Sequence, residues 1–338
     1  MLRVSVLDQS PIAAGATAGD ALRTTLELAQ LADSLGYERY WLAEHHSFSA
    51  LAGSVPEILV GHVASATTRI RVGSGGVMLP HYSPLKVAET FRMLEVLHPG
   101  RIDLGVGRAP GADPLTTFAL QARHRDPTAD DFPNQLIELV GFLNGTIPDS
   151  HAFSRIKVMP DSGAAPALWL LGSGGSSAQF AGQFGLPYAY AHFINPSGGE
   201  RLASDYRKAF HSTSAHAAPY VGICVSTICA DSDEEAERLA ASLRLWRLRL
   251  ERGDPGQIPT VEEALEYPYT PSEEARVNEL ASRFVVGGPE SVHRQLLALA
   301  ERFEADELFI VTICHDQSAR LHSYQLLAEA FDLSGSSD

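Results

Sequence analysis

A short apolar stretch ends in three ionisable side chains. Residues 40–43 (YWLA) read as a β-strand, and Glu44, His45 and His46 follow directly. A carboxylate beside two imidazoles suits general acid–base chemistry, for which we expect the pKa of His45 to lie near neutrality. A histidine packed at the surface without a catalytic role is the alternative. Adjacent side chains on a strand point in opposite directions and the sequence contains no HExxH spacing, so we predict no metal site.

Two further groups suit an anion. Arg108 follows an apolar strand at residues 101–107, and a guanidinium can bind a phosphate through two parallel hydrogen bonds. After another strand, the chain reads GSGGSS over residues 172–177, and a helix begins there. Free backbone N–H groups and the positive end of the helix dipole then meet at one point. A salt bridge for Arg108 and a capped turn without a ligand are the alternatives.

A glycine-rich strand lies between these groups in the sequence. Residues 71–77 contain Gly73, Gly75 and Gly76. Glycine weakens a strand and often marks the close approach of another backbone or of a flat ligand. A simple turn is the alternative interpretation.

Strand and helix patterns alternate along the whole chain and must position these groups. Strands are predicted at residues 2–7, 40–43, 71–77, 101–107, 167–171, 187–191, 220–230 and 307–311. Helices are predicted at residues 20–35, 56–66, 84–98, 132–144, 176–184, 201–211, 233–250, 290–303 and 319–331. This alternation predicts a parallel sheet, and the absence of GxGxxG after the first strand disfavours a doubly wound dinucleotide-binding domain. We therefore predict an α/β fold, a single (β/α)8 TIM barrel with active residues at the carboxyl ends of its strands.

Two segments interrupt the alternation. Residues 109–130 follow the fourth strand, and residues 252–271 follow the seventh strand and are rich in proline. Neither shows a clear period, and irregular segments of this length usually have a function or move. We predict insertions after strands 4 and 7, one domain over residues 1–333 and a disordered tail at residues 334–338.

Charge and cysteine content exclude several partners. The chain has 26 basic and 41 acidic residues, a net charge of −15, which disfavours nucleic acid and anionic membranes. No apolar run approaches the roughly 20 residues of a membrane span, and the first residues lack a signal peptide pattern. Cys224, Cys229 and Cys314 form no CxxC motif. We expect a cytoplasmic protein with reduced thiols, without nucleic-acid or membrane partners.

Together these motifs resemble the bacterial-luciferase-like family of flavin-dependent monooxygenases over nearly the whole length. The resemblance is carried by residues 41–46 (WLAEHH), 72–80 (VGSGGVMLP), 100–108 (GRIDLGVGR), 169–177 (WLLGSGGSS), 185–187 (GLP), 289–292 and 306–308. It implies a (β/α)8 barrel that binds FMN as FMNH2 supplied by a separate flavin reductase. It also implies reaction with O2 to a C4a-peroxyflavin, which oxygenates a small organic substrate.

The resemblance also implies roles for individual residues. His45 matches the catalytic histidine, and Glu44 beside it is the second predicted catalytic residue. Gly75 and Gly76 match the pair joined by a non-proline cis peptide bond under the isoalloxazine ring. The phosphate-binding positions match Arg108, Ser173, Gly174, Ser176 and Ser177. Residues 252–283 match the mobile loop that closes over the site, and family dimers imply a homodimer through the helices beside the second and third strands.

The chain also departs from the family pattern. Gly107, predicted to contact the cofactor, stands where luciferase has a reactive cysteine, which puts a thiol role and light emission in doubt. A second phosphate-binding arginine, expected at residues 126–133, has no match, and Arg123 or Arg125 could replace it.

Three other functions remain open at this point. The first is an F420-dependent oxidoreductase of the same fold. The second is a metal-dependent hydrolase using Glu44, His45 and His46, and the third is a flavin-binding protein without catalysis. Within the family, residues 130–133 (DDFP) most resemble tailoring monooxygenases of actinomycete secondary metabolism, of polyketide type. The sequence does not indicate the substrate, because the loops that would line its pocket carry no interpretable motif.

Overall fold

The computed structural model describes residues 2–109, 111–121, 131–161 and 163–333, and the predicted tail lies outside this part. It contains one sheet of parallel strands. The strands are β1 (Arg3–Asp8), β2 (Arg39–Leu42), β3 (Arg71–Met78), β4 (Ile102–Gly107), β5 (Ala167–Gly172), β6 (Tyr188–Ala191), β7 (Val221–Cys229), β8 (Phe284–Gly287) and β9 (Glu307–Val311). Neighbours pair in the order β6-β5-β4-β3-β2-β1-β9-β7-β8, and β6 also pairs with β7.

The extra pairing between β6 and β7 closes the sheet into a barrel of eight strands. Residues 222–226 of β7 pair with β9. The last four residues of β7, 226–229, pair with β8, which is the ninth strand of the sheet and has no other partner strand in the described part of the chain. β2, β4 and β7 are buried along their whole lengths, as expected for parallel strands covered on both faces. The predicted (β/α)8 barrel is confirmed, and each of the eight predicted strands is present.

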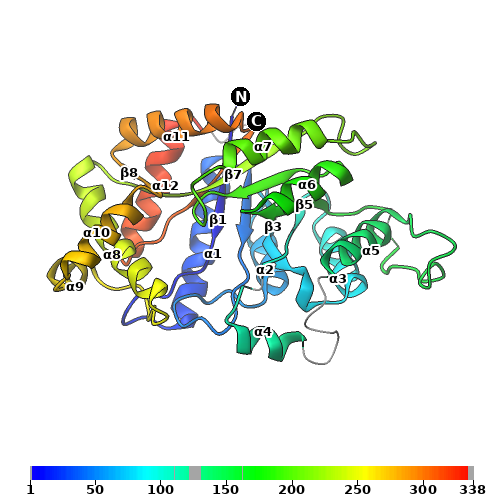
Figure 1. The fold of residues 1–338 in the computed structure, drawn as a ribbon, viewed down its shortest axis with the longest axis horizontal. Helices are drawn as coiled ribbons and strands as arrows, with labels where there is room; N and C mark the ends of the chain where they lie inside the picture. Colours follow the sequence, from blue (N-terminus) through cyan, green and yellow to red (C-terminus); the bar gives the residue numbers. More distant parts are fainter. Residues whose placement is uncertain (1, 110, 122–130, 162, 334–338) are drawn as a thin grey trace.

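Helices surround this barrel (Figure 1). They are α1 (Ala18–Leu35), α2 (Pro56–Ala66), α3 (Pro84–Leu97), α4 (Pro114–Gln121), α5 (Phe132–Asn144), α6 (Gly175–Phe184), α7 (Gly199–Ala209), α8 (Asp233–Glu251), α9 (Val261–Glu266), α10 (Pro271–Ala281), α11 (Pro289–Phe303) and α12 (Gln317–Ala330), with a 3-10 turn η1 (Leu79–His81). Local signals explain several ends: Thr17 and Asp20 form a capping box for α1, and α2, α3 and α11 begin at a proline. Within the described residues, none of these helices combines the length and apolarity that crossing a bilayer requires.

The two segments predicted to be irregular contain regular structure, so that prediction was wrong. α4 lies in the first, α9 in the second, and α10 and β8 follow directly. The threonine side chains at the N-caps of α9 and α10 accept hydrogen bonds from the backbone of Glu263 and Glu273. Apolar periodicity is weak because these short helices bury few side chains, among them Val261, Ala264 and Leu280.

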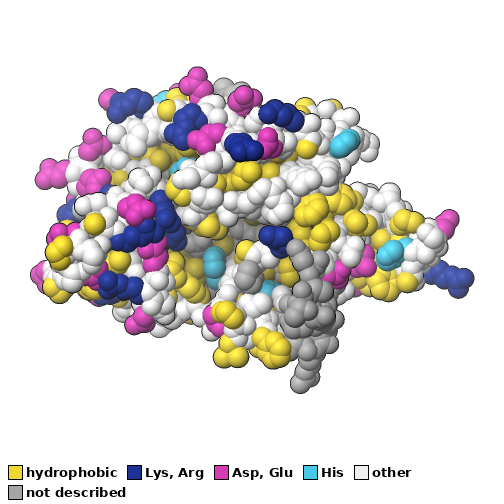
Figure 2. Space-filling model, in the orientation of Figure 1, with side chains coloured by type: hydrophobic (Ala, Val, Ile, Leu, Met, Phe, Trp, Pro, Cys, Tyr) yellow, Lys and Arg dark blue, Asp and Glu magenta, His cyan; other side chains and the backbone are white. Residues whose placement is uncertain are grey.

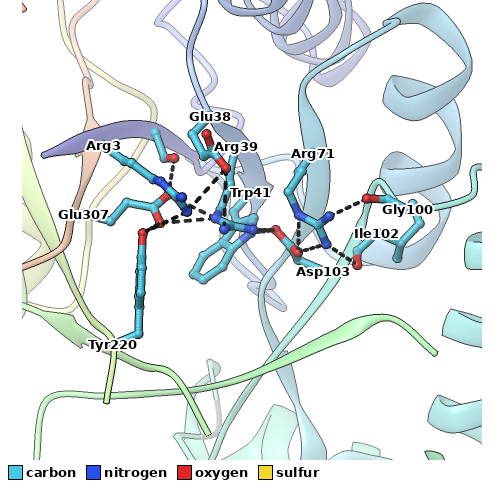
Figure 3. A network of polar contacts seen from close by, with 11 residues as sticks. Arg3, Glu38, Arg39, Trp41, Arg71, Gly100, Ile102, Asp103, Tyr220 and Glu307 are labelled. Carbon is cyan, nitrogen blue, oxygen red and sulfur yellow. Dashed lines mark hydrogen bonds and ion pairs between the residues drawn. The ribbon is translucent and has the colours of Figure 1, made fainter. Parts of the chain in front are cut away.

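A buried ionic network occupies the end of the barrel where the strands begin (Figure 3). Arg39, the first residue of β2, donates to Asp103 at 2.9 Å and to Glu307 at 3.1 Å. Trp41 and Arg71 also donate to Asp103, and Asp103 and Glu307 are both fully buried. Polar groups at this end of a TIM barrel usually contribute to stability, which leaves the opposite end for chemistry.

Candidate active site

A large cavity opens at the carboxyl ends of the strands. It encloses about 1020 Å³ of space outside the protein atoms, part of it open to solvent. Figure 2 shows a hollow across the face of the molecule. Every site residue predicted from the sequence lines the cavity: Glu44, His45, Gly75, Gly76, Gly107, Arg108, Ser173, Gly174, Ser176 and Ser177. The structure therefore brings together groups from four strand ends that lie up to 133 residues apart in the sequence.

Glu44 is fully buried and holds its neighbours in place. One carboxylate oxygen accepts hydrogen bonds from the ring of His46 at 2.7 Å and from the hydroxyl of Tyr82 at 2.7 Å. The other oxygen accepts from the backbone N–H of Met78 at 2.9 Å. Burial, followed by the charge of Glu44, raises the pKa of Tyr82 well above its usual value. Glu44 thus links the end of β2 to the end of β3.

His45 differs from the sequence expectation. Burial and the neighbouring imidazole of His46 lower its pKa to about 4, so the prediction of a value near neutrality was wrong. The sequence could not show this, because it does not show which parts of the ring neighbouring residues cover. His45 is therefore neutral at pH 7, and its Nδ1 atom is buried without a hydrogen-bond partner in the described residues. A neutral imidazole with an unused nitrogen can donate or accept one hydrogen bond to a bound molecule.

The turn between β5 and α6 has the geometry of an anion site. Gly174 is the N-cap residue of α6, and no side chain caps the helix. A Cβ atom at Gly174 would meet nothing within 4 Å, so the turn leaves open space beside it. Ser173, Ser176 and Ser177 place hydroxyl groups around the same turn, and Arg108 lines the same cavity from the end of β4. Backbone N–H groups, hydroxyls and a guanidinium suit a phosphate.

Gly75 and Gly76 form a part of the wall that has no side chains. The peptide bond between them is cis, as the resemblance implies. A Cβ atom at Gly75 would lie 2.5 Å from Cδ1 of Leu7, and one at Gly76 would lie 2.7 Å from the carbonyl oxygen of Gly105. Neighbouring strands pack so closely here that only glycine fits. Apolar residues such as Ala189 line the rest of this part, which suits a planar ring.

The sequence did not predict some of the residues that line the cavity. Gln9 follows β1, Met78 ends β3, and Phe193 and Ile194 follow β6. The rule that strand ends carry site residues could have found Gln9 and Met78. Arg123 and Arg125, the candidates for a second phosphate-binding arginine, lie outside the described residues. Within the described part, no group of three or more His, Cys, Asp or Glu side chains is placed to hold a metal ion.

The fold and the site define a (β/α)8 barrel enzyme with its candidate active site at the carboxyl ends of the strands. Residues 2–306 match the model of a family described as luciferase-like monooxygenase. The chain is 40% identical to a luciferase-like monooxygenase of Escherichia coli strain K12, with 95% of each chain covered. It is 38% identical to the N-acetyl-S-alkylcysteine monooxygenase of Bacillus subtilis strain 168, with 98% of each covered. The chain belongs to the luciferase-like monooxygenase family.

Solved structures agree with this assignment. The crystal structure of apo-MsnO8 is 42% identical, with a TM-score of 0.90 over 98% of this chain and 99% of that chain. Two structures at lower identity share the fold. One is the oxygenating constituent of 3,6-diketocamphane monooxygenase from Pseudomonas putida in complex with FMN, at 20% identity and a TM-score of 0.73. The other is an F420-dependent secondary alcohol dehydrogenase, at 16% identity and a TM-score of 0.66. The family and the relatives at 38–40% identity identify the chain as an oxidoreductase of the monooxygenase class.

Proposed function

We propose that the protein is an FMNH2-dependent monooxygenase that takes reduced FMN from a separate flavin reductase and uses O2 to oxygenate a small organic substrate. One observation carries the proposal. A single cavity holds a turn suited to an anion, with Arg108, at one part and the Gly75–Gly76 wall, which has no side chains, with apolar neighbours at another. A phosphorylated planar cofactor has these two features in one molecule. Bound there, reduced FMN would supply the electrons for O2 activation.

The residues of the chain would act around that cofactor in distinct ways. Arg108 and the backbone N–H groups at the start of α6 would hold the phosphate. His45, neutral at pH 7, would offer one hydrogen bond through its ring. Glu44 is a positioning residue in this proposal, because its carboxylate accepts hydrogen bonds from His46, Tyr82 and Met78. The apolar walls would exclude water from the reacting atoms.

Calorimetric titration of the purified protein with FMN tests the phosphate site. Arg108→Met should weaken FMN binding by about tenfold or more, because a charge-assisted hydrogen bond contributes about 1.5–3 kcal/mol. The control is Arg201→Met on α7, an exposed arginine that does not line the cavity, which should leave FMN affinity unchanged. Equal FMN affinity of wild type and Arg108→Met contradicts the assigned role.

Turnover should require the complete system. We expect substrate oxygenation only when FMN, NAD(P)H, O2 and a flavin reductase are all present. An F420-dependent oxidoreductase is the second candidate, supported by neighbours with that cofactor in the same fold. Competition between FMN and F420 for the purified protein separates the two, and tighter binding of F420 would replace the first proposal by the second.

The outer surface supports a homodimer. Ile58 on α2 is 68% exposed and Leu97 on α3 is 62% exposed, and Met93 and Val96 lie exposed on α3 beside it. These helices accompany β2 and β3, where the family resemblance places the dimer contact. A homodimer would bury these apolar side chains. Light scattering should report a dimer that Ile58→Glu together with Leu97→Glu converts to a monomer, whereas a monomeric wild type contradicts the proposal.

Two finer proposals concern the cellular setting. All three cysteines are buried free thiols, which fits a cytoplasmic location. A role in secondary-metabolite tailoring rests on the sequence resemblance alone. Comparison of the metabolites of a strain with and without the gene tests that role, and unchanged secondary metabolites would contradict it.

A further inference from the structure

A smaller cavity adjoins the large one. It is a narrow space of about 230 Å³ outside the protein atoms, part of it open to solvent, and it shares Gln9 and Phe193 with the lining of the large cavity. Its other walls come mainly from α8, β8 and the end of β9, and include Leu243, Trp246 and Phe284. Gln9 and Phe193 therefore separate the two cavities and contact both of them.

An arginine whose positive charge has few partners lines the smaller cavity. Arg247, on α8, donates one hydrogen bond, from Nη2 to the carbonyl oxygen of Phe193 at 3.3 Å. It forms no ion pair in the described part of the chain. Burial and the like charge of Arg283 lower the pKa of Arg247, and Glu251 opposes this only in part. A half-buried guanidinium with one carbonyl partner is incompletely solvated, so an anion there would be stabilised.

The surrounding charges leave the positive field uncancelled. The side chain of Arg283 has no hydrogen bond or ion pair in the described residues. Glu251, the carboxylate whose charge opposes this effect, accepts two hydrogen bonds from Arg276 at 2.8 and 2.7 Å. Figure 2 shows basic and acidic side chains gathered over α8 and α10, beside the hollow. In a chain of net charge −15, this is a local site that favours an anion.

Trp246 supplies a second unused donor. Its side chain is 2% exposed and lines the same cavity, and its Nε1 atom has no hydrogen-bond partner in the described structure. Leu243 and Phe284 are also buried, so the Trp246 N–H and the remaining N–H groups of Arg247 lie at a cavity with largely apolar walls. A carboxylate has acceptor oxygens for both donors, whereas a neutral hydrocarbon would leave both unsatisfied.

We propose that the organic substrate of this enzyme is an amphipathic carboxylate whose carboxylate group binds Arg247 in the smaller cavity, with its apolar body extending into the large cavity. This inference rests on the proposed function, because only an enzyme of that kind would oxygenate the bound carboxylate. Binding of the carboxylate itself does not depend on flavin chemistry. Arg283 would add to the positive field, and the Trp246 N–H would donate to a carboxylate oxygen. The reacting carbon or heteroatom would then lie on the side of Gln9 and Phe193 that faces Gly75 and Gly76.

Calorimetry with a matched pair of ligands tests this inference. The probes are 4-phenylbutanoate and 4-phenylbutanamide, which have similar shapes and differ in charge. Wild type should bind the carboxylate about tenfold or more tightly than the amide, the effect expected of a charge-assisted hydrogen bond. Arg247→Met should abolish this preference, Arg283→Gln should reduce it, and Arg247→Lys should retain part of it. Arg238→Met, which removes an exposed arginine of the same helix, should leave it unchanged.

Several outcomes overturn the inference. They are equal affinity for the two probes in wild type, no binding of the carboxylate at millimolar concentration, and a preference that survives in Arg247→Met. Circular dichroism verifies that each variant is folded. The same samples are titrated with FMN. If wild type does not bind FMN but prefers the carboxylate to the amide, only the proposed function is rejected. Intact FMN binding without a carboxylate preference rejects this inference alone.

Discussion

The low pKa of His45 predicts a specific dependence of stability on pH. The folded protein holds this pKa at about 4, against the usual value of 6.5 expected for the unfolded chain. The unfolded state therefore binds a proton more readily than the folded state as the pH falls. The stability associated with neutral His45 is fully present above pH 6.5 and is lost as the pH falls from there toward 4.

The magnitude follows from these two values. At pH 7 both states are mostly neutral at this position, whereas at pH 5 the unfolded chain is protonated and folded His45 is mostly neutral. The linkage relation then gives a loss of about 2 kcal/mol in the free energy of unfolding between pH 7 and pH 5. His45→Gln, which does not titrate, should lack this part of the pH dependence.

Urea unfolding of wild type and His45→Gln at pH 7 and pH 5 measures the difference. Other titrating groups affect both proteins alike, so they cancel in the comparison. His62→Gln on α2, which removes an exposed histidine, is the matched control and should behave like wild type. Equal pH dependence in wild type and His45→Gln would show that His45 has an ordinary pKa, and the interpretation of an imidazole that is neutral at pH 5 would be wrong.

Two further predictions concern the barrel and the cavity wall. Arg39→Met leaves Asp103 and Glu307 buried without their shared cation, which should lower the free energy of unfolding by about 3–5 kcal/mol, whereas Arg238→Met at an exposed ion pair should cost about 1 kcal/mol or less. Similar urea midpoints for the two variants would contradict the structural role of the network. The second prediction concerns the cavity wall: Gly105→Ala should destabilise the protein by about 1–3 kcal/mol, because its Cβ atom would clash with the carbonyl oxygen of Ser74. Gly107→Ala on the same strand should be tolerated, since its Cβ atom would meet only the carbonyl oxygen of Leu171 at 3.9 Å, and equal thermal stability of the two variants would refute this distinction.

The barrel and its mouth could be predicted because both depend on local patterns. Buried parallel strands are continuous apolar runs, and glycine, serine and charged residues directly follow several of them. The rule that strand ends converge then places Glu44 and Ser177 in one cavity without knowledge of the packing. β8 could not be found in this way, because it has four residues and adds to the outside of an already closed barrel.

Other features depend on contacts between distant residues. Arg39 pairs with Asp103 and Glu307, which lie 64 and 268 positions away, so the buried network has no local signature. The pKa of His45 depends on how tightly neighbouring segments cover the ring, which no residue type reveals. Arg247 lies within a long helix with several other arginines, and only the fold shows that it lines a cavity while Arg238 faces solvent.

A crystal structure of the protein with FMN tests the central claim most directly, namely that one cavity holds both ends of a phosphorylated planar cofactor. We predict the phosphate at Arg108 and the turn of residues 173–177, with the isoalloxazine ring against Gly75 and Gly76 beside His45. Density for FMN elsewhere on the protein, or a ring turned away from these glycines with the phosphate remote from Arg108, would contradict the account.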